Sequence, residues 1–180
     1  RPQNNIPAGE KLMIATEMAK AIAVLHGFED GIIVHDDIQL TQFFWIDGQM
    51  KLTDFNRAEI MLWDEEHNEY CRYRNGVGPG NFRSPEEYFD NPLNEKIDVF
   101  SFGNIIYGLL TGLWPFYEIE DDRIVQAKMK KGETSFIDPR YRNRSEAEQV
   151  LVDVMEQCWR FNPDDRIDIF GALKILEKAV

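Results

Sequence analysis

The chain has 180 residues, and 43% of them are hydrophobic, so it is long enough to bury one sizeable core and is not a disordered tail. It carries 20 Lys and Arg residues against 32 Asp and Glu residues, which gives a formal net charge of -12. This balance argues against an extended nucleic-acid-binding face, which needs clustered positive charge.

The cysteine content and the lengths of the apolar runs bear on the compartment. Cys71 and Cys158 are too few for a disulfide framework, and no His or Cys residues stand near them at zinc-finger spacing. We therefore expect both thiols to be reduced and the protein to be intracellular, in the cytoplasm. No apolar run approaches the roughly 20 residues that a bilayer-spanning helix needs, so no membrane segment is expected in this chain. Tethering through sequence outside the chain stays open.

The first half of the chain predicts a linker, a helix and a small hairpin. Residues 1–9 are rich in Pro, Asn and Gly and are typical of a linker at the start of a fragment. Over residues 10–26, apolar side chains recur at three- and four-residue spacing, as on one stripe of an amphipathic helix. After a short apolar run, two extended segments at 43–46 and 50–53 flank an Asp-Gly turn and predict a hairpin.

The second half predicts a long loop followed by helices. Residues 57–83 show no sustained periodicity, carry many charges and are expected to form a long surface loop, and loops of this length are usually either functional or disordered. Residues 95–111 are apolar nearly all round, which indicates a central helix buried on every side. Further helices are expected at 122–131, 145–159 and 167–179. The predicted fold class is therefore mainly α (α+β).

Acidic residues stand at both ends of the predicted hairpin. His35-Asp36-Asp37 precedes the first strand, and Asp54-Phe55-Asn56 follows the second, so the turn between the strands folds the two ends toward each other. A pair of carboxylates placed in this way can hold a divalent cation or act as a base beside one. Ordinary turn capping by Asp and Asn is the alternative interpretation for any one of these residues.

Several motifs together resemble the eukaryotic protein kinase family. Residues 35–42, HDDIQLTQ, are similar to the catalytic loop H-R-D-L-K-x-x-N, and 54–56, DFN, are similar to D-F-G. Residues 84–86, SPE, resemble A-P-E, and 98–103, DVFSFG, resemble D-V-W-S-F-G of the central helix. Residues 162–166, NPDDR, resemble the late motif whose arginine pairs with the A-P-E glutamate. These motifs stand in the order and spacing of the family.

The resemblance implies the C-terminal lobe of a kinase-like domain over residues 10–180. In that lobe a helical bundle surrounds the buried central helix, and a short hairpin lies at the catalytic cleft. Residues 35–42 would be the catalytic loop and 54–86 the activation segment. No Gly-rich phosphate loop, strand lysine or helix glutamate of a kinase N-terminal lobe is present in the sequence. The implied partners are that N-terminal lobe and a protein substrate or protein partner.

The resemblance also assigns roles at the catalytic cleft and implies ATP and Mg²⁺ as cofactors. Asp37 matches the catalytic aspartate that accepts the proton of the substrate hydroxyl, and Asp54 matches the aspartate that holds magnesium. Gln39 stands where the family has a lysine, and Gln42 stands where it has the asparagine that binds the second magnesium ion. Pro79 replaces a threonine that bridges the catalytic aspartate and the loop lysine in Ser/Thr kinases.

Other positions match the family's scaffold. The resemblance places His35 and Phe55 in a stacked pair, with Asp98 bonded to the backbone of the catalytic loop. It also pairs two motif residues, so Glu86 and Arg166 are expected to form a buried ion pair. The apolar column that reaches the adenine ring in the family, with plain core as the alternative, is matched by Phe44, Ile105 and Leu109.

Asp36 takes the place of the family's arginine that grips a phosphorylated loop residue. A carboxylate would repel a phosphate, and the sequence between Asn56 and Arg83 contains no Ser or Thr. We therefore expect Asp36 to pair with Arg72 or Arg74 and to lock the loop without phosphorylation. Solvated arginines and a turn-capping Asp36 are the alternative.

The sequence leaves three functions open. The first is a pseudokinase-like signalling module that folds and binds partners with little phosphoryl transfer. The second is an active, divergent protein kinase whose N-terminal lobe comes from sequence outside this chain. The third is a structural helical module for protein interaction. Preference for Ser/Thr or Tyr acceptors cannot be assigned, because the positions that usually announce it match neither pattern.

Overall fold

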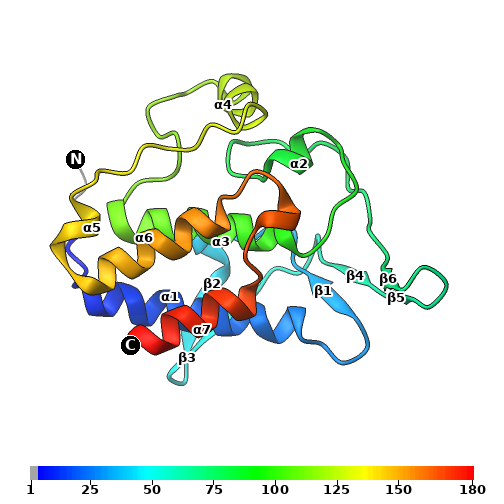
Figure 1. The fold of residues 1–180 in the computed structure, drawn as a ribbon, viewed down its shortest axis with the longest axis horizontal. Helices are drawn as coiled ribbons and strands as arrows, with labels where there is room; N and C mark the ends of the chain where they lie inside the picture. Colours follow the sequence, from blue (N-terminus) through cyan, green and yellow to red (C-terminus); the bar gives the residue numbers. More distant parts are fainter. Residues whose placement is uncertain (1–3) are drawn as a thin grey trace.

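The computed structural model describes residues 4–180, so residues 1–3 of the expected 1–9 linker lie outside the described part. The body is a bundle of helices, and short antiparallel ribbons lie beside it (Figure 1). The helices are α1 (Ala8–His26), α2 (Pro85–Tyr88), α3 (Lys96–Thr111), α4 (Asp122–Met129), α5 (Tyr141–Arg144), α6 (Glu146–Cys158) and α7 (Ile169–Ala179). Two short 3-10 turns stand at Leu40–Gln42 and Pro163–Asp165. The expected mainly α class is confirmed.

Helix α3 lies at the centre of the helical bundle, as its apolar sequence predicts. It packs against α1 and α6, and α7 packs against α1 and α6 from the far side. Val99, Phe102 and Ile106 on α3 have no more than 2% of their surface exposed. The helix ends at Gly112, whose φ of 74° is the left-handed conformation that glycine adopts at a helix C-cap without steric cost.

The strands form three separate two-stranded ribbons. Their bounds are β1 (Ile32–Val34), β2 (Phe43–Ile46), β3 (Gln49–Leu52), β4 (Glu59–Met61), β5 (Trp63–Asp64) and β6 (Glu69–Tyr70). In the β2–β3 hairpin, Asp47 and Gly48 have φ values of 51° and 75°, the pair of positive angles that a type I′ turn requires. The hairpin and its Asp-Gly turn therefore form as the sequence predicts, with β3 starting at Gln49 instead of residue 50.

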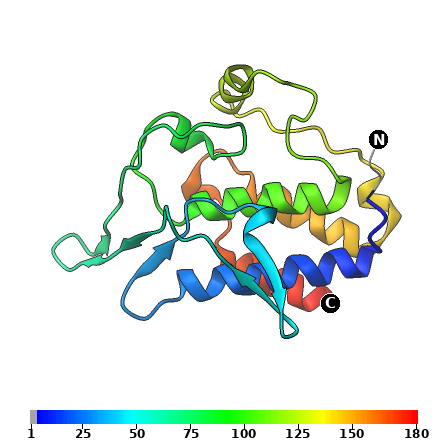
Figure 2. The same ribbon diagram turned by 180° about the vertical axis from the view of Figure 1, so that it is seen from behind.

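Part of the 57–83 loop has more structure than its sequence predicts. Strand β4 pairs antiparallel with β1, with Ile32 opposite Met61, so the segment is anchored to the chain just before the 35–42 loop. Strands β5 and β6 then form a hairpin that projects away from the helices in both views (Figures 1 and 2). The β1–β4 pairing joins distant parts of the chain, and short-range periodicity carries no signal for it.

Candidate active site

Asp98 at the start of α3 fixes the backbone of the 35–42 loop. Its side chain is 1% exposed, and its two oxygens accept the backbone N–H groups of His35 at 2.7 Å and Asp36 at 2.9 Å. His26 of α1 contacts the same carboxylate at 3.0 Å. Asp36 has a φ of 60°, a strained conformation for a non-glycine residue, so these bonds hold a backbone shape that would otherwise be unfavourable.

A stacked pair joins the 35–42 loop to the motif at 54–56. The rings of His35 and Phe55 meet edge-on with centroids 5.1 Å apart, and His35 Nε2 lies 2.9 Å from the carbonyl oxygen of Thr53. Asp54 follows with a φ of 63°. The structure thus brings His35, Phe55 and Asp98 together in the arrangement that the resemblance implies.

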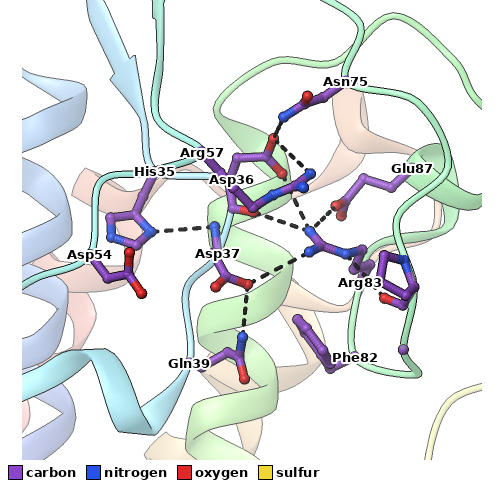
Figure 3. Close-up of polar contacts among 12 residues, drawn as sticks. His35, Asp36, Asp37, Gln39, Asp54, Arg57, Asn75, Phe82, Arg83 and Glu87 are labelled. Atoms are coloured by element: carbon purple, nitrogen blue, oxygen red, sulfur yellow. Dashed lines mark hydrogen bonds and ion pairs between the residues drawn. The ribbon is translucent and has the colours of Figure 1, made fainter.

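The side-chain amides of two glutamines donate hydrogen bonds to the carboxylate of Asp37. Gln39 Nε2 donates to Asp37 Oδ1 at 2.7 Å, and Gln42 Nε2 donates to Asp37 Oδ2 at 3.3 Å. The same Gln42 nitrogen donates to Oδ2 of Asp54 at 3.3 Å, so one amide group bridges the two acidic side chains. Figure 3 shows Gln39 pointing at Asp37, with Asp54 on the other side of the loop.

In this arrangement the Gln42 amide turns its nitrogen, and not its oxygen, toward Asp37 and Asp54. Magnesium needs oxygen ligands in near-ideal octahedral geometry, whereas the Gln42 group between the carboxylates presents N–H donors. Among residues 4–180, no cluster of three or more His, Cys, Asp or Glu side chains is suited to hold a metal ion. Gln42 would have to turn its amide over, and Gln39 would have to release Asp37, before a cation could enter between Asp37 and Asp54.

The partners of Asp36 differ from those expected. Asp36 is buried and contacts Arg57 and Arg83, each at 3.4 Å, and it accepts a hydrogen bond from Asn75. The expected pairing with Arg72 or Arg74 is wrong. Arg72 lies 3.7 Å from Asp164, and Arg74 donates to the carbonyl oxygen of Asp90. The order of charges along the loop could not show which arginine turns inward.

Burial and counter-charges act in opposite directions on Asp36. Burial raises the pKa of the Asp36 carboxyl above its ordinary value, and the Asn75 hydrogen bond and the charges of Arg57 and Arg83 oppose that rise. Asn75 and the two arginines therefore offset only part of the cost of placing a carboxylate in the interior, and the pKa of Asp36 stays raised.

Arg83 lies at the centre of this cluster of charged side chains, and the sequence analysis assigned it no role. Its Nη1 donates to Glu87 Oε1 at 3.1 Å and to the carbonyl oxygen of Asp36 at 3.1 Å, and its Nη2 lies 3.7 Å from Asp37 Oδ1 (Figure 3). The guanidinium also stacks over the ring of Phe82, 5.1 Å from its centroid. A cation standing directly before the SPE motif was the available signal.

Glu87 is a further acidic residue in contact with Arg83. Its carboxylate accepts the backbone N–H and the hydroxyl of Ser84 at 2.7 and 2.8 Å, closing a capping box at the start of α2. Burial raises the pKa of Glu87 to about 7, against the opposing effects of Arg83 and Ser84. This carboxyl therefore titrates near neutral pH.

Glu86 and Arg166 form the expected ion pair. The guanidinium donates to both carboxylate oxygens, at 2.6 and 3.1 Å, and both residues are buried. Arg166 also donates to the carbonyl oxygen of Lys96 and lies 5.0 Å over the ring of Phe100. The end of the 54–86 segment is thereby tied to α3 and to the chain before α7.

The residues matched to the adenine-contacting column are divided between core and surface. Ile105 and Leu109 on α3 are 2% and 5% exposed and belong to the main hydrophobic cluster. Phe44 on β2 is 53% exposed. Their burial gives Ile105 and Leu109 a core role, while the Phe44 side chain is exposed to solvent.

Comparison with known proteins places this geometry in a family. Residues 2–177 match the protein kinase domain. This chain belongs to the protein kinase family. Enzymes of the family use ATP and Mg²⁺ and act on proteins. The matched residues cover the helical body, the 35–42 loop and the 54–86 segment, and they correspond to the C-terminal lobe of such a domain.

Individual relatives are distant in sequence and much longer than this kinase domain segment. It is 25% identical to the probable serine/threonine-protein kinase SIS8 of Arabidopsis thaliana, over 100% of the chain and 17% of that protein. It is 29% identical to serine/threonine-protein kinase 12 of the same plant, over 92% of the chain and 35% of that protein. It is 28% identical to atrial natriuretic peptide receptor 2 of Bos taurus, over 89% of the chain and 15% of that protein.

The chain thus spans well under half the length of these relatives. Within residues 4–180, none of the helices has the length and apolar character needed to cross a membrane.

Proposed function

We propose that this kinase lobe is a pseudokinase-like signalling module that binds protein partners and transfers phosphate poorly or not at all. The observation that carries the proposal is the state of Asp37, whose two oxygens are both engaged by glutamine amides. A general base needs a free oxygen within hydrogen-bonding reach of the substrate hydroxyl. In this chain each carboxylate oxygen of Asp37 already accepts a hydrogen bond from a glutamine of the same loop.

Gln39 supports the proposal through charge. The family's lysine at this position neutralises charge on the transferred phosphoryl group, and a neutral amide supplies no such charge. Removing one preorganised electrostatic contact of this kind lowers the rate by about 10²-fold to 10³-fold. The 2.7 Å hydrogen bond from Gln39 to Asp37 adds a second effect, because it holds the amide on the base instead of on a phosphate.

Gln42 supports the proposal because it disfavours magnesium binding. Its side chain is one methylene longer than the family's asparagine, and its amide nitrogen reaches both Asp37 and Asp54. A nucleotide held in this cleft would meet hydrogen-bond donors where the family places magnesium. We therefore propose that any nucleotide binding by the full-length protein depends weakly on Mg²⁺.

The 54–86 segment supports a module that is not switched by phosphorylation. Asp36 is buried against Arg57 and Arg83, and the loop between Asn56 and Arg83 has no Ser or Thr. The hydroxyl of Tyr73 in this loop is buried without a hydrogen-bond partner among the described residues. Fixed ion pairs then take the place of a phosphate that would order the loop.

An active, divergent kinase is the second candidate, because Asp37 and Asp54 are both retained and Asp54 is exposed to solvent. In either case we propose that a kinase N-terminal lobe outside this chain supplies the remaining nucleotide contacts, and that the protein acts in the cytoplasm. Protein substrates belong to the second candidate and protein partners to the first.

A thermal-shift assay of nucleotide binding by the full-length protein separates the two candidate functions. The proposal predicts a small ATP-induced shift that is the same with MgCl₂ and with EDTA. Gln42→Asn should make the shift depend on Mg²⁺, while Gln49→Asn, an exposed glutamine at the hairpin turn, serves as the matched control. A wild-type shift that requires Mg²⁺ would favour the active kinase.

A further inference from the structure

The ribbon of β1 and β4 leads from the helical body into the projecting hairpin, and its two faces differ (Figure 2). Ile33 stands opposite Ile60, and the neighbouring pair joins Ile32 to Met61. Met61 is 2% exposed and lies in a small hydrophobic cluster with Val34, and Ile32 packs against that cluster. Because side chains alternate between the faces of a strand, Ile33 and Ile60 point the other way. We call the face that carries them the outer face.

The outer face is apolar and open to solvent. It continues from Ile60 to Leu62, two residues later on the same side, and these side chains are 58% and 57% exposed. A Cβ atom at Gly31, the residue before β1, would lie 3.4 Å from Cγ2 of Ile60 and 3.6 Å from Cδ2 of Leu62. The two side chains therefore lie together over the Gly31 backbone. Covering them would remove apolar area from water, which favours association.

The β5–β6 hairpin extends the outer face and adds carboxylates to it. Trp63 stands opposite Tyr70, and Asp64 stands opposite Glu69. Tyr70 packs against the buried cluster, and the ring of Trp63 meets it edge-on at 5.0 Å, so this pair continues the buried face. Asp64 and Glu69 form the next pair and point outward, on the side of Leu62. The outer face therefore runs from apolar side chains to two carboxylates.

Asp64 and Glu69 are a like-charge pair, which destabilises a two-stranded ribbon. Nδ1 of His67 lies 2.8 Å from Oδ2 of Asp64 and compensates that side of the pair. Glu69 is in no ion pair within residues 4–180. A cation supplied by a partner would relieve the repulsion between the two carboxylates.

A second chain segment brings further carboxylates to the same end of the outer face. Glu29 and Asp30 are exposed and form a turn, closed by a 3.3 Å hydrogen bond from the backbone N–H of Gly31 to the carbonyl oxygen of Phe28. Because β1 and β4 are antiparallel, residues before Gly31 lie toward the same end of the ribbon as residues after Leu62. Acidic residues from two segments thus gather where the apolar part ends.

The charges indicate which occupant fits the outer face. The nearest arginines along the chain are engaged elsewhere, since Arg57 contacts Asp36 and Arg72 lies 3.7 Å from Asp164. The carboxylates of the outer face therefore keep their charge for a partner, and a cationic partner is complementary to them. A second copy of this chain, with its net charge of -12, would be repelled, and so would an anionic membrane.

We propose that the outer face binds a basic protein segment that carries apolar side chains. Ile33, Ile60 and Leu62 would pack against the apolar side chains, and Asp64 and Glu69 would pair with Lys or Arg. The inference rests on the proposed function in one respect, namely that the module works by binding protein partners. It adds the place and the chemistry of one partner, at a surface outside the cleft that holds the catalytic aspartate.

The test selects peptides from a displayed random library on the full-length protein and discards those that also bind Ile60→Ser/Leu62→Ser. The remaining peptides are expected to be basic and to contain apolar residues. In fluorescence anisotropy they should bind the wild-type protein at least about tenfold more tightly than the variant, because two apolar side chains become buried. The proposal is overturned if no peptide distinguishes the two proteins, or if the peptides that do so are acidic or uncharged.

Val24→Ser/Ile124→Ser is the matched control for the apolar change. These side chains lie on α1 and α4 and are 72% and 51% exposed, so the control removes a similar exposed apolar area far along the chain from the ribbon. The selected peptides should bind it as tightly as the wild-type protein. An equal loss of affinity in the control and in Ile60→Ser/Leu62→Ser would overturn the proposal.

The charge arm uses Asp64→Asn/Glu69→Gln, which removes a repulsion and so should not unfold the protein. It should weaken the selected peptides and reduce the dependence of their affinity on salt, because salt screens exposed charges. Glu118→Gln/Glu120→Gln removes as much charge from exposed positions elsewhere and should leave both quantities unchanged. Affinity and salt dependence that stay the same in Asp64→Asn/Glu69→Gln would count against the basic partner.

Cys71 reports where a peptide binds. Its backbone N–H donates to the carbonyl oxygen of Leu62 at 2.9 Å, and the residue is exposed. A saturating selected peptide should slow the alkylation of Cys71 by iodoacetamide, and an unchanged rate would contradict binding at the outer face. A dimer of the full-length protein that dissociates in Ile60→Ser/Leu62→Ser would assign the face to a second copy and overturn the proposal. An active kinase would refute the proposed function without changing these readouts, since none of them measures phosphoryl transfer.

Discussion

Nη1 of Arg83 lies 3.4 Å from Oδ1 of Asp36 and donates to the backbone carbonyl of the same residue at 3.1 Å. The cation comes from the 54–86 segment and the anion from the 35–42 loop. In much of the family the charges are the other way round, with an arginine in the loop that meets a phosphate on the segment. We propose that the exchange of polarity removes the need for the phosphate.

The first prediction concerns the stability of the segment between Arg57 and Arg83. Asp36→Asn and Arg83→Gln should each increase its cleavage by protease, because each change removes one charge from the buried contact between Asp36 and Arg83. The effects of the two changes should be less than additive in the combined variant, since both remove the contact between Asp36 and Arg83. Limited proteolysis with mass spectrometry measures the rates.

Arg72→Gln is the matched control for Arg83→Gln. Arg72 is exposed and lies 3.7 Å from an exposed Asp164, and pairs of that kind contribute under about 1 kcal/mol. It should leave the cleavage rate unchanged. Additive effects of the Asp36 and Arg83 substitutions would contradict a shared role.

The second prediction concerns Glu86 and Arg166. Glu86→Ala leaves the Arg166 guanidinium buried without its carboxylate and should lower the free energy of unfolding by roughly 3–5 kcal/mol. Glu65→Ala, at an exposed position in the projecting hairpin, provides the comparison. Denaturant unfolding of the full-length protein measures the free energy of unfolding of both variants. An equal loss in the two would show that the pair of Glu86 and Arg166 does not stabilise the fold.

The third prediction follows from the raised pKa of Glu87. The pKa is about 7 in the folded protein and ordinarily 4.5, so between these values the folded state binds a proton that the unfolded state has released. Stability contributed by Glu87 is therefore present below about pH 4.5 and is lost as the pH rises through about 7. Glu87→Gln should remove this part of the pH dependence.

Urea unfolding from pH 4.5 to 8 tests the Glu87 prediction. The wild-type protein should lose stability relative to Glu87→Gln as the pH rises through this window. A constant difference between the two proteins would show that the Glu87 pKa is not raised. Glu133→Gln, an exposed change, controls for the loss of one negative charge.

The fourth prediction concerns thiol reactivity. Cys71 is exposed and Cys158 is buried, and burial raises the pKa of the Cys158 thiol to about 12. Iodoacetamide at pH 8 should therefore alkylate Cys71 alone in the native protein and both residues after denaturation, as read by peptide mass spectrometry. Fast native modification of Cys158 would contradict the packing of α6 against α3.

Local sequence signals predicted the elements that depend on local interactions. The central helix was expected at 95–111 and is found at Lys96–Thr111, because a continuous apolar sequence requires burial on every side. Helix α1 was expected at residue 10 and begins at Ala8, because Pro7 and Gly9 were assigned to a linker. The short helices α2 and α5 were not predicted, since four residues carry too little periodicity.

The long-range contacts of the site could be predicted only where the family motifs supplied them. The Glu86 and Arg166 pair was expected because the resemblance joins the two motifs. No motif joins Asp36 to a partner, and choosing among the four arginines of the 57–83 loop needs the β1–β4 pairing that positions Arg57 and the α2 capping box that positions Arg83. These depend on tertiary structure and leave no periodic trace in the sequence.

Transfer of radiolabelled phosphate from ATP to a mixed protein substrate tests directly whether the site at Asp37 supports phosphoryl transfer. The full-length protein is compared with Gln39→Lys/Gln42→Asn and with Asp37→Asn. We predict wild-type transfer close to the Asp37→Asn background and an increase of about 10²-fold or more in the double variant, because a charge and an oxygen ligand are restored. Wild-type turnover within the range of about 1–100 s⁻¹ typical of kinases, lost in Asp37→Asn, would contradict it.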